Sequence, residues 1–286
     1  MDAKIARLVP TTTSRPQPLC YHFSKKMTFA FRSKTGIAHF PRLFRVRVLT
    51  FRSDMELKLT IAPASLNQFQ YYFDVDPERS RRAALSMGAF NSTSMFRDFP
   101  FPFEQLPTDG VVVDVGGGGG HVSAELSRKY HHLKFVVQDL GESIASGAAN
   151  PEFSGLPIEW QEHGLFEPQA VLHADAYIIR HVLHGFQDEI AAEILGYISK
   201  AMDPNRSRIL IIDCVVPEAF GSDSIPFVNA TDVLALLGGN GKQRDAKAWD
   251  ALVKMADERL QVMKIWYQRH LASADAVIEI RMTSNL

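Results

Sequence analysis

A histidine at the end of an apolar run is the residue best suited to catalysis in this chain. His184 follows residues 176–182, which read as a buried strand, and it precedes an acid-rich helical stretch that begins at Asp188. An imidazole titrates near neutral pH, so it can take the proton of a hydroxyl group. His181 would point to the opposite side if the strand continued that far, and packing is then its expected role. The pattern predicts His184 as a general base.

Five consecutive glycines, residues 116–120, predict a loop that binds a ligand. The β-branched run of residues 111–115 before them predicts a strand, and apolar residues recur with helical spacing from Val122 to Tyr130. A second strand is predicted at residues 133–137, and Asp139 follows it. Glycine permits sharp turns and a close approach of the ligand, and the carboxyl ends of parallel strands line the ligand crevice of open α/β sheets.

Charge near the loop distinguishes between two classes of cofactor. The NAD fingerprint G-x-G-x-x-G is not matched, because its third position falls on His121, Val122 or the tolerable Ser123. Asp114, directly before the loop, would repel a pyrophosphate, whereas it would favour the sulfonium and ammonium groups of S-adenosylmethionine. The sequence therefore favours S-adenosylmethionine, with Asp139 placed to hold a ribose.

The segments that follow alternate between strand and helix patterns. Further strands are predicted at 158–161, 176–182, 208–214, 260–267 and 276–282, and helices at 142–149 and 188–202. Seven strands of this kind predict a doubly wound α/β sheet.

Four segments together carry a family resemblance: VVVDVGGGGGH, VVQDL, ADAYIIRHVLHGFQDE and SRILIIDCVVPE. They resemble the plant-type small-molecule O-methyltransferases, and most closely the fungal relatives of natural-product pathways, from about Phe69 to the C-terminus. The resemblance implies a Rossmann-like methyltransferase sheet and S-adenosylmethionine as cofactor. It also implies methylation of a hydroxyl, phenolic in type, on a small secondary metabolite such as a polyketide or an alkaloid.

The resemblance also assigns roles to individual residues. Those implied for catalysis are His184 as base, Asp213 as the carboxylate that orients it, and Gln243 as a lesser partner. Those implied for the cofactor are Gly116, Gly118, Asp139 and Arg180. Met87 fits a position near the transferred methyl group and the substrate, although an ordinary core methionine is an equal reading.

Three departures from the family pattern leave other functions open. Gly164 replaces an acid expected near the adenine, Gly185 replaces an acid after the histidine, and Gln243 cannot hold a negative charge beside an imidazolium. One alternative is a cyclase or pericyclase-like enzyme on the same fold. The shortened N-terminal region leaves another alternative, a non-catalytic subunit that binds a partner chain.

The charge is unevenly distributed along the chain. Residues 1–53 hold eleven Lys or Arg and one acid, whereas the whole chain has a net charge of −1. We predict a basic segment of unknown structure at 1–53, a helical and linker region at 54–107, and the methyltransferase domain at 108–286. The basic segment has the composition of an organellar transit peptide or a polyanion-binding arm. A truncated or divergent start is the favoured interpretation, because the enzymes that this chain resembles begin with a longer helical domain that forms a homodimer.

Composition excludes several other classes. The net charge of −1 gives no global attraction to nucleic acid or membranes, and no apolar run reaches membrane-spanning length. Cys20 and Cys214 predict neither a disulfide framework nor a metal site. A cytoplasmic protein with a small-molecule substrate is expected.

Overall fold

A twisted sheet with helices on both faces forms the centre of the described chain. The computed structural model describes residues 47–51, 57–60, 82, 99–217, 225–239, 241–267 and 275–283. Met87 and residues 1–46 of the predicted basic segment lie outside the described residues.

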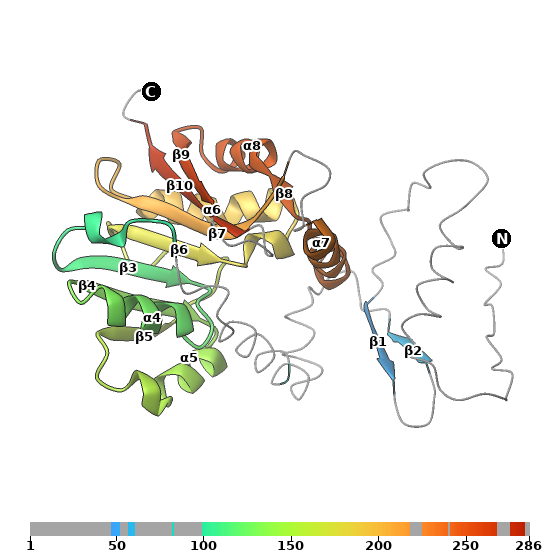
Figure 1. Ribbon diagram of the computed structural model, residues 1–286, viewed down its shortest axis with the longest axis horizontal. Coiled ribbons are helices and arrows are strands. Elements are labelled where there is room, and N and C mark those ends of the chain that lie inside the picture. The colour runs from blue at the N-terminus through green and yellow to red at the C-terminus, as the bar shows by residue number, and fades with distance from the viewer. Residues whose placement is uncertain are drawn as a thin grey trace, which may run out of the picture. The chain divides into compact units, whose positions relative to one another are not determined.

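The sheet has eight strands, seven of them in the order β5-β4-β3-β6-β7-β10-β9, with β8 paired to β7 (Figure 1). The first five are parallel to one another, and β10 runs antiparallel to both β7 and β9. The strands are β3 (Gly110–Val115), β4 (Leu133–Asp139), β5 (Ile158–Glu162), β6 (Ala176–Arg180), β7 (Arg208–Val216), β8 (Arg244–Asp245), β9 (Leu260–Tyr267) and β10 (Asp275–Met282).

The strand order reverses next to β3. The chain first adds β4 and β5 on one side of β3, and then adds β6 and β7 on the other side. In open α/β sheets the ligand crevice lies at such a switch point, outside the carboxyl ends of the strands. The segments that follow β3 and β6 therefore flank the expected crevice.

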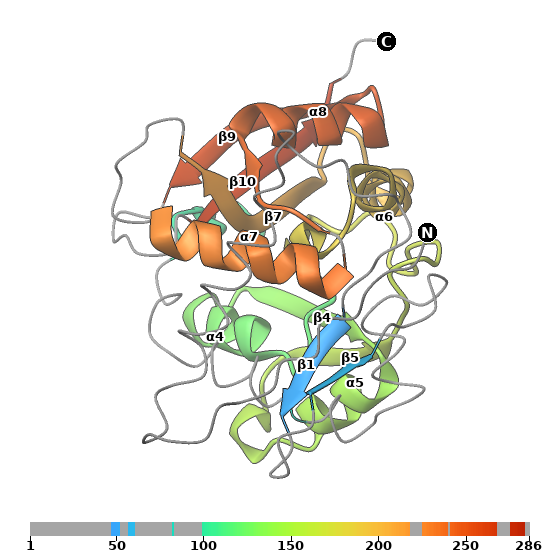
Figure 2. The same cartoon turned by 90° about the vertical axis from the view of Figure 1, so that its right-hand side faces the viewer.

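The helices are α4 (His121–Lys129), α5 (Gly141–Ala148), α6 (Asp188–Ala201), α7 (Ile225–Gly239) and α8 (Ala246–Ala256). The short 3₁₀ helices are η2 (Phe103–Gln105), η3 (Pro151–Phe153) and η4 (Leu183–Gly185). Helices α6 and α8 contact each other, and α7 contacts η4 and β7 (Figure 2).

Successive side chains of a strand point to opposite faces of the sheet, and this alternation produces one apolar layer on each face. Ile179 belongs to the layer that α6 and α8 cover, whereas its neighbour Ile178 belongs to the layer with α4. The aromatic-proline linker joins the second layer, since Phe101 and Phe103 are buried in it with ring centroids 4.9 Å apart. Both faces are thus covered, as a largely parallel sheet requires.

The prediction of a doubly wound sheet is confirmed, with all seven predicted strands present. Strand β6 ends at Arg180, two residues earlier than predicted, and this difference matters for the site. Helix α7 was not predicted from periodicity, and its apolar composition all round explains why, because no face stands out.

Before the sheet, β1 (Arg47–Phe51) pairs antiparallel with β2 (Leu57–Thr60). Strand β2 thus lies at the start of the region predicted to be helix and linker. Between residues 61 and 98 of the predicted helical and linker region, the structure describes only Arg82, which is helical. Among the described residues, no helix has both the length and the apolar character that a membrane span requires.

Candidate active site

The glycine loop follows β3 and owes its shape to left-handed residues. Gly116, Gly118 and Gly120 have φ values of +70°, +58° and +75°, which side chains other than glycine rarely adopt. The N–H groups of Gly116 and Gly117 both donate to the carbonyl of Gln138 in β4. The loop is thereby tied to the end of the neighbouring strand.

Close packing also requires glycine at the far end of the loop. A Cβ atom at Gly120 would lie 2.4 Å from the ring of Trp160, and one at Gly147 of α5 would lie 2.3 Å from it. Trp160 belongs to β5 and stacks on Phe153, with ring centroids 6.2 Å apart. The start of α4 is therefore held against the neighbouring strands and helix.

Asp139 lies at the carboxyl end of β4 and binds the loop directly. One of its oxygens accepts a hydrogen bond from Gly118 N–H at 2.8 Å, and the other accepts from Leu140 N–H at 2.8 Å. Two residues predicted for the cofactor, Gly118 and Asp139, are thus joined to each other.

Asp114 is a buried carboxylate beneath the loop. Its Oδ2 accepts a hydrogen bond from Ser123 Oγ at 2.7 Å, and its Oδ1 is buried without a hydrogen-bond partner among the described residues. Burial raises the pKa of Asp114 to about 6, although Ser123 and Arg180 act in the opposite direction. A buried carboxylate of this kind costs folding free energy, and a cation placed beside it would offset that cost.

We expect Asp114→Asn to stabilise the protein at neutral pH by up to about 3 kcal/mol. The folded pKa is raised, so the wild type loses stability as the pH rises from 3.8 to about 6. Denaturant unfolding of both proteins across this window should show the difference growing with pH. Asp250→Asn on an exposed face of α8 should change stability little. A wild-type-like unfolding free energy for Asp114→Asn at every pH would contradict the assignment.

Arg180 ends β6 and is buried. Burial lowers the pKa of its guanidinium, while the nearby carboxylates of Asp275, Asp114 and Asp213 act to raise it. Arg180 therefore lies between the glycine-loop side and the histidine side of the switch point.

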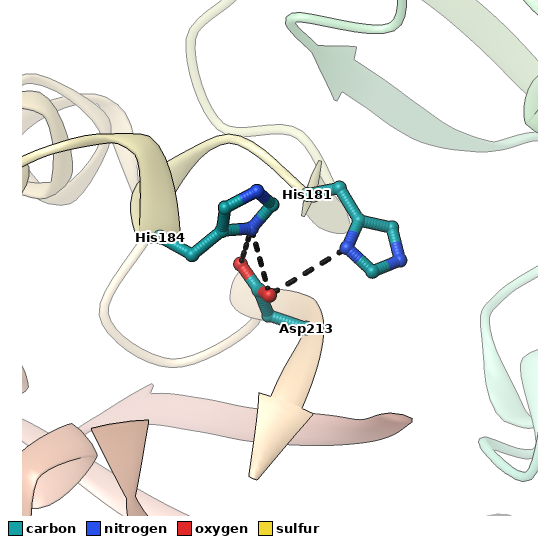
Figure 3. Close-up of side chains that lie close together, drawn as sticks. All are labelled: His181, His184 and Asp213. Carbon is teal, nitrogen blue, oxygen red and sulfur yellow. Dashed lines mark hydrogen bonds and ion pairs between the residues drawn. The ribbon is translucent and has the colours of Figure 1, made fainter. Parts of the chain in front are cut away.

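His184 and Asp213 form the closest histidine–carboxylate pair of the site (Figure 3). Nδ1 of His184 lies 2.9 Å from Oδ1 and 3.0 Å from Oδ2 of Asp213. His184 is on η4 directly after β6, and Asp213 is on β7, the next strand. Burial raises the pKa of Asp213, but His184 and His181 outweigh it and hold that pKa well below its usual range. The carboxylate is therefore ionised at neutral pH.

His181 was expected to point away from His184 only if the strand reached it, and β6 ends one residue earlier. Because β6 ends at Arg180, His181 adopts a left-handed φ of +50°, and its N–H donates to the carbonyl of Ile212. Its ring turns toward Asp213, with ring centroids of the two histidines 5.5 Å apart (Figure 3). The alternation of a strand does not apply beyond the strand's last residue.

The side chains of His181, His184 and Asp213 are spaced like a metal-binding group, since their possible ligand atoms lie within 4.8 Å of one another. Transition metals bind neutral imidazole. Burial lowers the pKa of His181, but Asp213 and Asp275 outweigh burial and raise it to about 9. The two carboxylates thus favour the cationic form of His181, and we interpret the group as an ion-pair network.

Gln243 lies in the segment before α8. Its backbone N–H donates to Asp232 at 2.7 Å, and its side-chain oxygen is buried without a hydrogen-bond partner among the described residues. No hydrogen bond of the described chain joins its side chain to His184. The role of Gln243 as a lesser partner of the base stays a prediction.

Arg244 is a buried residue of the site that sequence reasoning missed. Its guanidinium donates to the carbonyls of Leu183 at 3.0 Å and Phe186 at 2.9 Å, on either side of His184, and to Asp188 at 2.9 Å. Lys242 N–H also donates to the carbonyl of His184 at 2.9 Å. The segment around Arg244 therefore fixes the backbone that carries the histidine. Its sequence neighbourhood, GKQRDAKAWD, is rich in charged residues, so nothing in the sequence distinguished Arg244 from an exposed surface arginine.

The departure at Gly164 has a carboxylate beside it. A Cβ atom at Gly164 would lie 3.3 Å from Oε1 of Glu167, and Glu167 also lies 3.5 Å from Nδ1 of His163. An acidic group is thus present next to the glycine, although it comes from a different residue.

Comparison with known proteins identifies the family. Residues 85–257 match the family model of the O-methyltransferase domain. The chain belongs to this O-methyltransferase family. It is 39% identical over 201 residues to sterigmatocystin 8-O-methyltransferase of Aspergillus parasiticus, covering 70% of this chain and 47% of that protein. It is 40% identical over 200 residues to O-methyltransferase xanE of Aspergillus fumigatus, covering 69% of this chain and 46% of that one.

A solved structure agrees with the family's fold. The complex of LepI with S-adenosylmethionine matches with a TM-score of 0.63 and 28% identity, covering 74% of this chain and 54% of that one. The predicted resemblance to fungal O-methyltransferases is confirmed. The chain spans about half the length of these curated relatives.

Proposed function

We propose that this O-methyltransferase family member transfers a methyl group from S-adenosylmethionine to a hydroxyl of a small natural product. The observation that carries the proposal is the contact of His184 with the ionised Asp213, at the switch point that the glycine loop also borders. A base and a cofactor loop at one sheet edge are what methyl transfer to a hydroxyl requires.

The chain's residues fit a cationic cofactor. Asp114 offers a buried carboxylate oxygen that no described residue hydrogen-bonds, next to a loop with three glycines of positive φ. We propose that Gly116, Gly118 and Asp139 bind the nucleoside part, that Asp114 attracts the positive charge, and that Arg180 lies close by. When bound, S-adenosylmethionine supplies an activated methyl group on its sulfonium.

His184 would take the proton of the substrate hydroxyl. Asp213 is ionised, so Nδ1 of His184 must carry the hydrogen of their bond, which leaves Nε2 as the acceptor. The hydroxyl proton moves to Nε2, and Asp213 stabilises the imidazolium that results. Arg244 keeps the histidine backbone in place through the carbonyls of Leu183 and Phe186. Alignment and deprotonation together account for the catalysis that these residues can provide.

The substrate is proposed to be a phenol of polyketide or alkaloid type. The relatives that match at 39–40% identity include sterigmatocystin 8-O-methyltransferase, whose name specifies an O-methylation of a natural product. We also propose a cytoplasmic location and a homodimer. Sedimentation analysis of the purified chain would test the dimer.

The decisive experiment is calorimetric titration with S-adenosylmethionine and S-adenosylhomocysteine. We expect the wild type to bind both, and Asp139→Ala to lose most of the affinity, because it removes the carboxylate at the end of β4 and releases Gly118. Asp250→Ala on the exposed face of α8 should bind like the wild type.

Absence of binding to folded wild-type protein would overturn the cofactor assignment. If the cofactor binds, a panel of phenols tests turnover, with S-adenosylhomocysteine as the product to detect. A product of unchanged mass without S-adenosylhomocysteine would instead indicate a cyclase.

A further inference from the structure

Two histidines share the carboxylate of Asp213, and the second one has a further acidic partner. Nδ1 of His181 lies 3.6 Å from Oδ1 of Asp213, and its Nε2 lies 3.3 Å from Oδ2 of Asp275. His184 contacts the same Oδ1 of Asp213 at 2.9 Å. The four side chains form one chain of contacts in the order Asp275, His181, Asp213, His184.

Three neighbouring strands bring this chain of contacts together. Asp213 is on β7, and Asp275 begins β10, which pairs with β7. His181 comes from the end of β6, on the other side of β7. His181 has a left-handed φ of +50°, a conformation that histidine, asparagine and aspartate adopt more often than most residues other than glycine. This turn of the backbone directly after β6 directs the ring toward the two carboxylates.

The two carboxylates that His181 contacts favour its cationic form. The charged or titratable groups that the structure describes around it are Asp213 of β7, Asp275 of β10, Arg180 of β6 and His184 of η4. Both aspartates are nearly inaccessible, with side chains 0% and 2% exposed. Buried carboxylates require compensating positive charge. A raised pKa of about 9 for His181 agrees with this arrangement.

We propose that His181 is a positioning residue that binds Asp213 together with His184 and offsets part of the carboxylate's charge. The inference rests on the proposed role of His184 as base. Without the second cation, the full negative charge of Asp213 would act on His184 and hold its proton more tightly. With it, Asp213 still orients His184, and the base gives up its proton more readily between turnovers.

The repulsion between the two rings acts in the same direction. Their centroids are 5.5 Å apart, so a protonated His181 disfavours a second positive charge on His184. Asp275 strengthens the effect from the far side, because it keeps His181 protonated without touching His184 in the described contacts.

The test is an NMR titration of isotope-labelled histidines in the full chain without added ligand. In the wild type, His181 should stay protonated through neutral pH. In His181→Asn, which suits a left-handed backbone, the His184 ring should bind its proton about tenfold more tightly, a shift of about one pH unit. Asp275→Asn should shift His184 in the same direction by less, since His181 then keeps only one carboxylate.

His173→Asn is a matched control, because His173 is also left-handed, with φ of +57°, but is exposed. It should leave the His184 titration unchanged. The NMR result does not depend on turnover, so it separates this inference from the proposed methylation. In active protein, the acidic limb of the pH profile of kcat should move to higher pH in His181→Asn.

The inference is overturned if His181 of the wild type loses its proton below neutral pH. It is equally overturned if the His184 titration in folded His181→Asn is the same as in the wild type. If His181→Asn does not fold, the NMR titration of His184 in Asp275→Asn tests the inference alone.

Discussion

His184→Gln is expected to lower kcat by about 10²- to 10⁴-fold, the usual contribution of a general base. Glutamine can still donate a hydrogen bond to Asp213, so the buried carboxylate keeps a partner and the fold should persist. Its amide cannot accept the hydroxyl proton and become a cation. Affinity for S-adenosylmethionine should stay close to that of the wild type, because His184 is not among the residues proposed to bind it.

The pH dependence of the residual activity sharpens this test. An ionised phenol needs no base, so the activity of His184→Gln should rise as the pH approaches the substrate's own pKa. The wild type should show no such dependence over the same range. His131→Gln, at an exposed position, is the matched control and should behave like the wild type. Unchanged kcat in His184→Gln would remove the histidine from the mechanism.

Asp213→Asn is expected to lower kcat by a similar factor, about 10²- to 10⁴-fold, for a different reason. An amide in place of the carboxylate can offer its N–H to Nδ1 of His184, which moves the ring hydrogen to Nε2. The lone pair needed for the substrate proton is then absent. The imidazolium formed during turnover also loses its negative partner.

The same substitution should destabilise the fold, because it leaves a cationic His181 with one carboxylate fewer. Removing one partner of a buried ion pair costs about 3–5 kcal/mol. In the wild type, the raised pKa of His181 contributes stability that is complete below pH 6.5 and lost as the pH rises through about 9. Chemical unfolding of both proteins across this window should show a smaller decline for Asp213→Asn. An equal decline of the unfolding free energy with pH in the two proteins would contradict the ion pair between His181 and Asp213.

Short-range patterns in the sequence determined the sheet and the cofactor side of the site. The local signals were runs of valine and isoleucine, the run of glycines and the helical spacing of apolar residues. They predicted the strands and the loop, and Asp114 and Asp139 then fell at the ends of two predicted strands. Parallel strands end at one edge, which placed His184 and Asp213 at the same edge of the sheet, and the family resemblance implied that they pair. Their roles stay predictions, as do those of Gly116, Gly118 and Arg180, while Met87 lies outside the described residues.

Tertiary structure alone decided what surrounds the base. The direction of His181 depends on where β6 stops, and one residue of left-handed backbone reverses the direction that strand alternation implies. Asp275 reaches it only because β10 pairs antiparallel with β7 in a particular register. Arg244 holds the carbonyls beside His184 from a position far along the chain. Such contacts follow from the packing of distant segments, and spacing in the sequence carries no record of that packing.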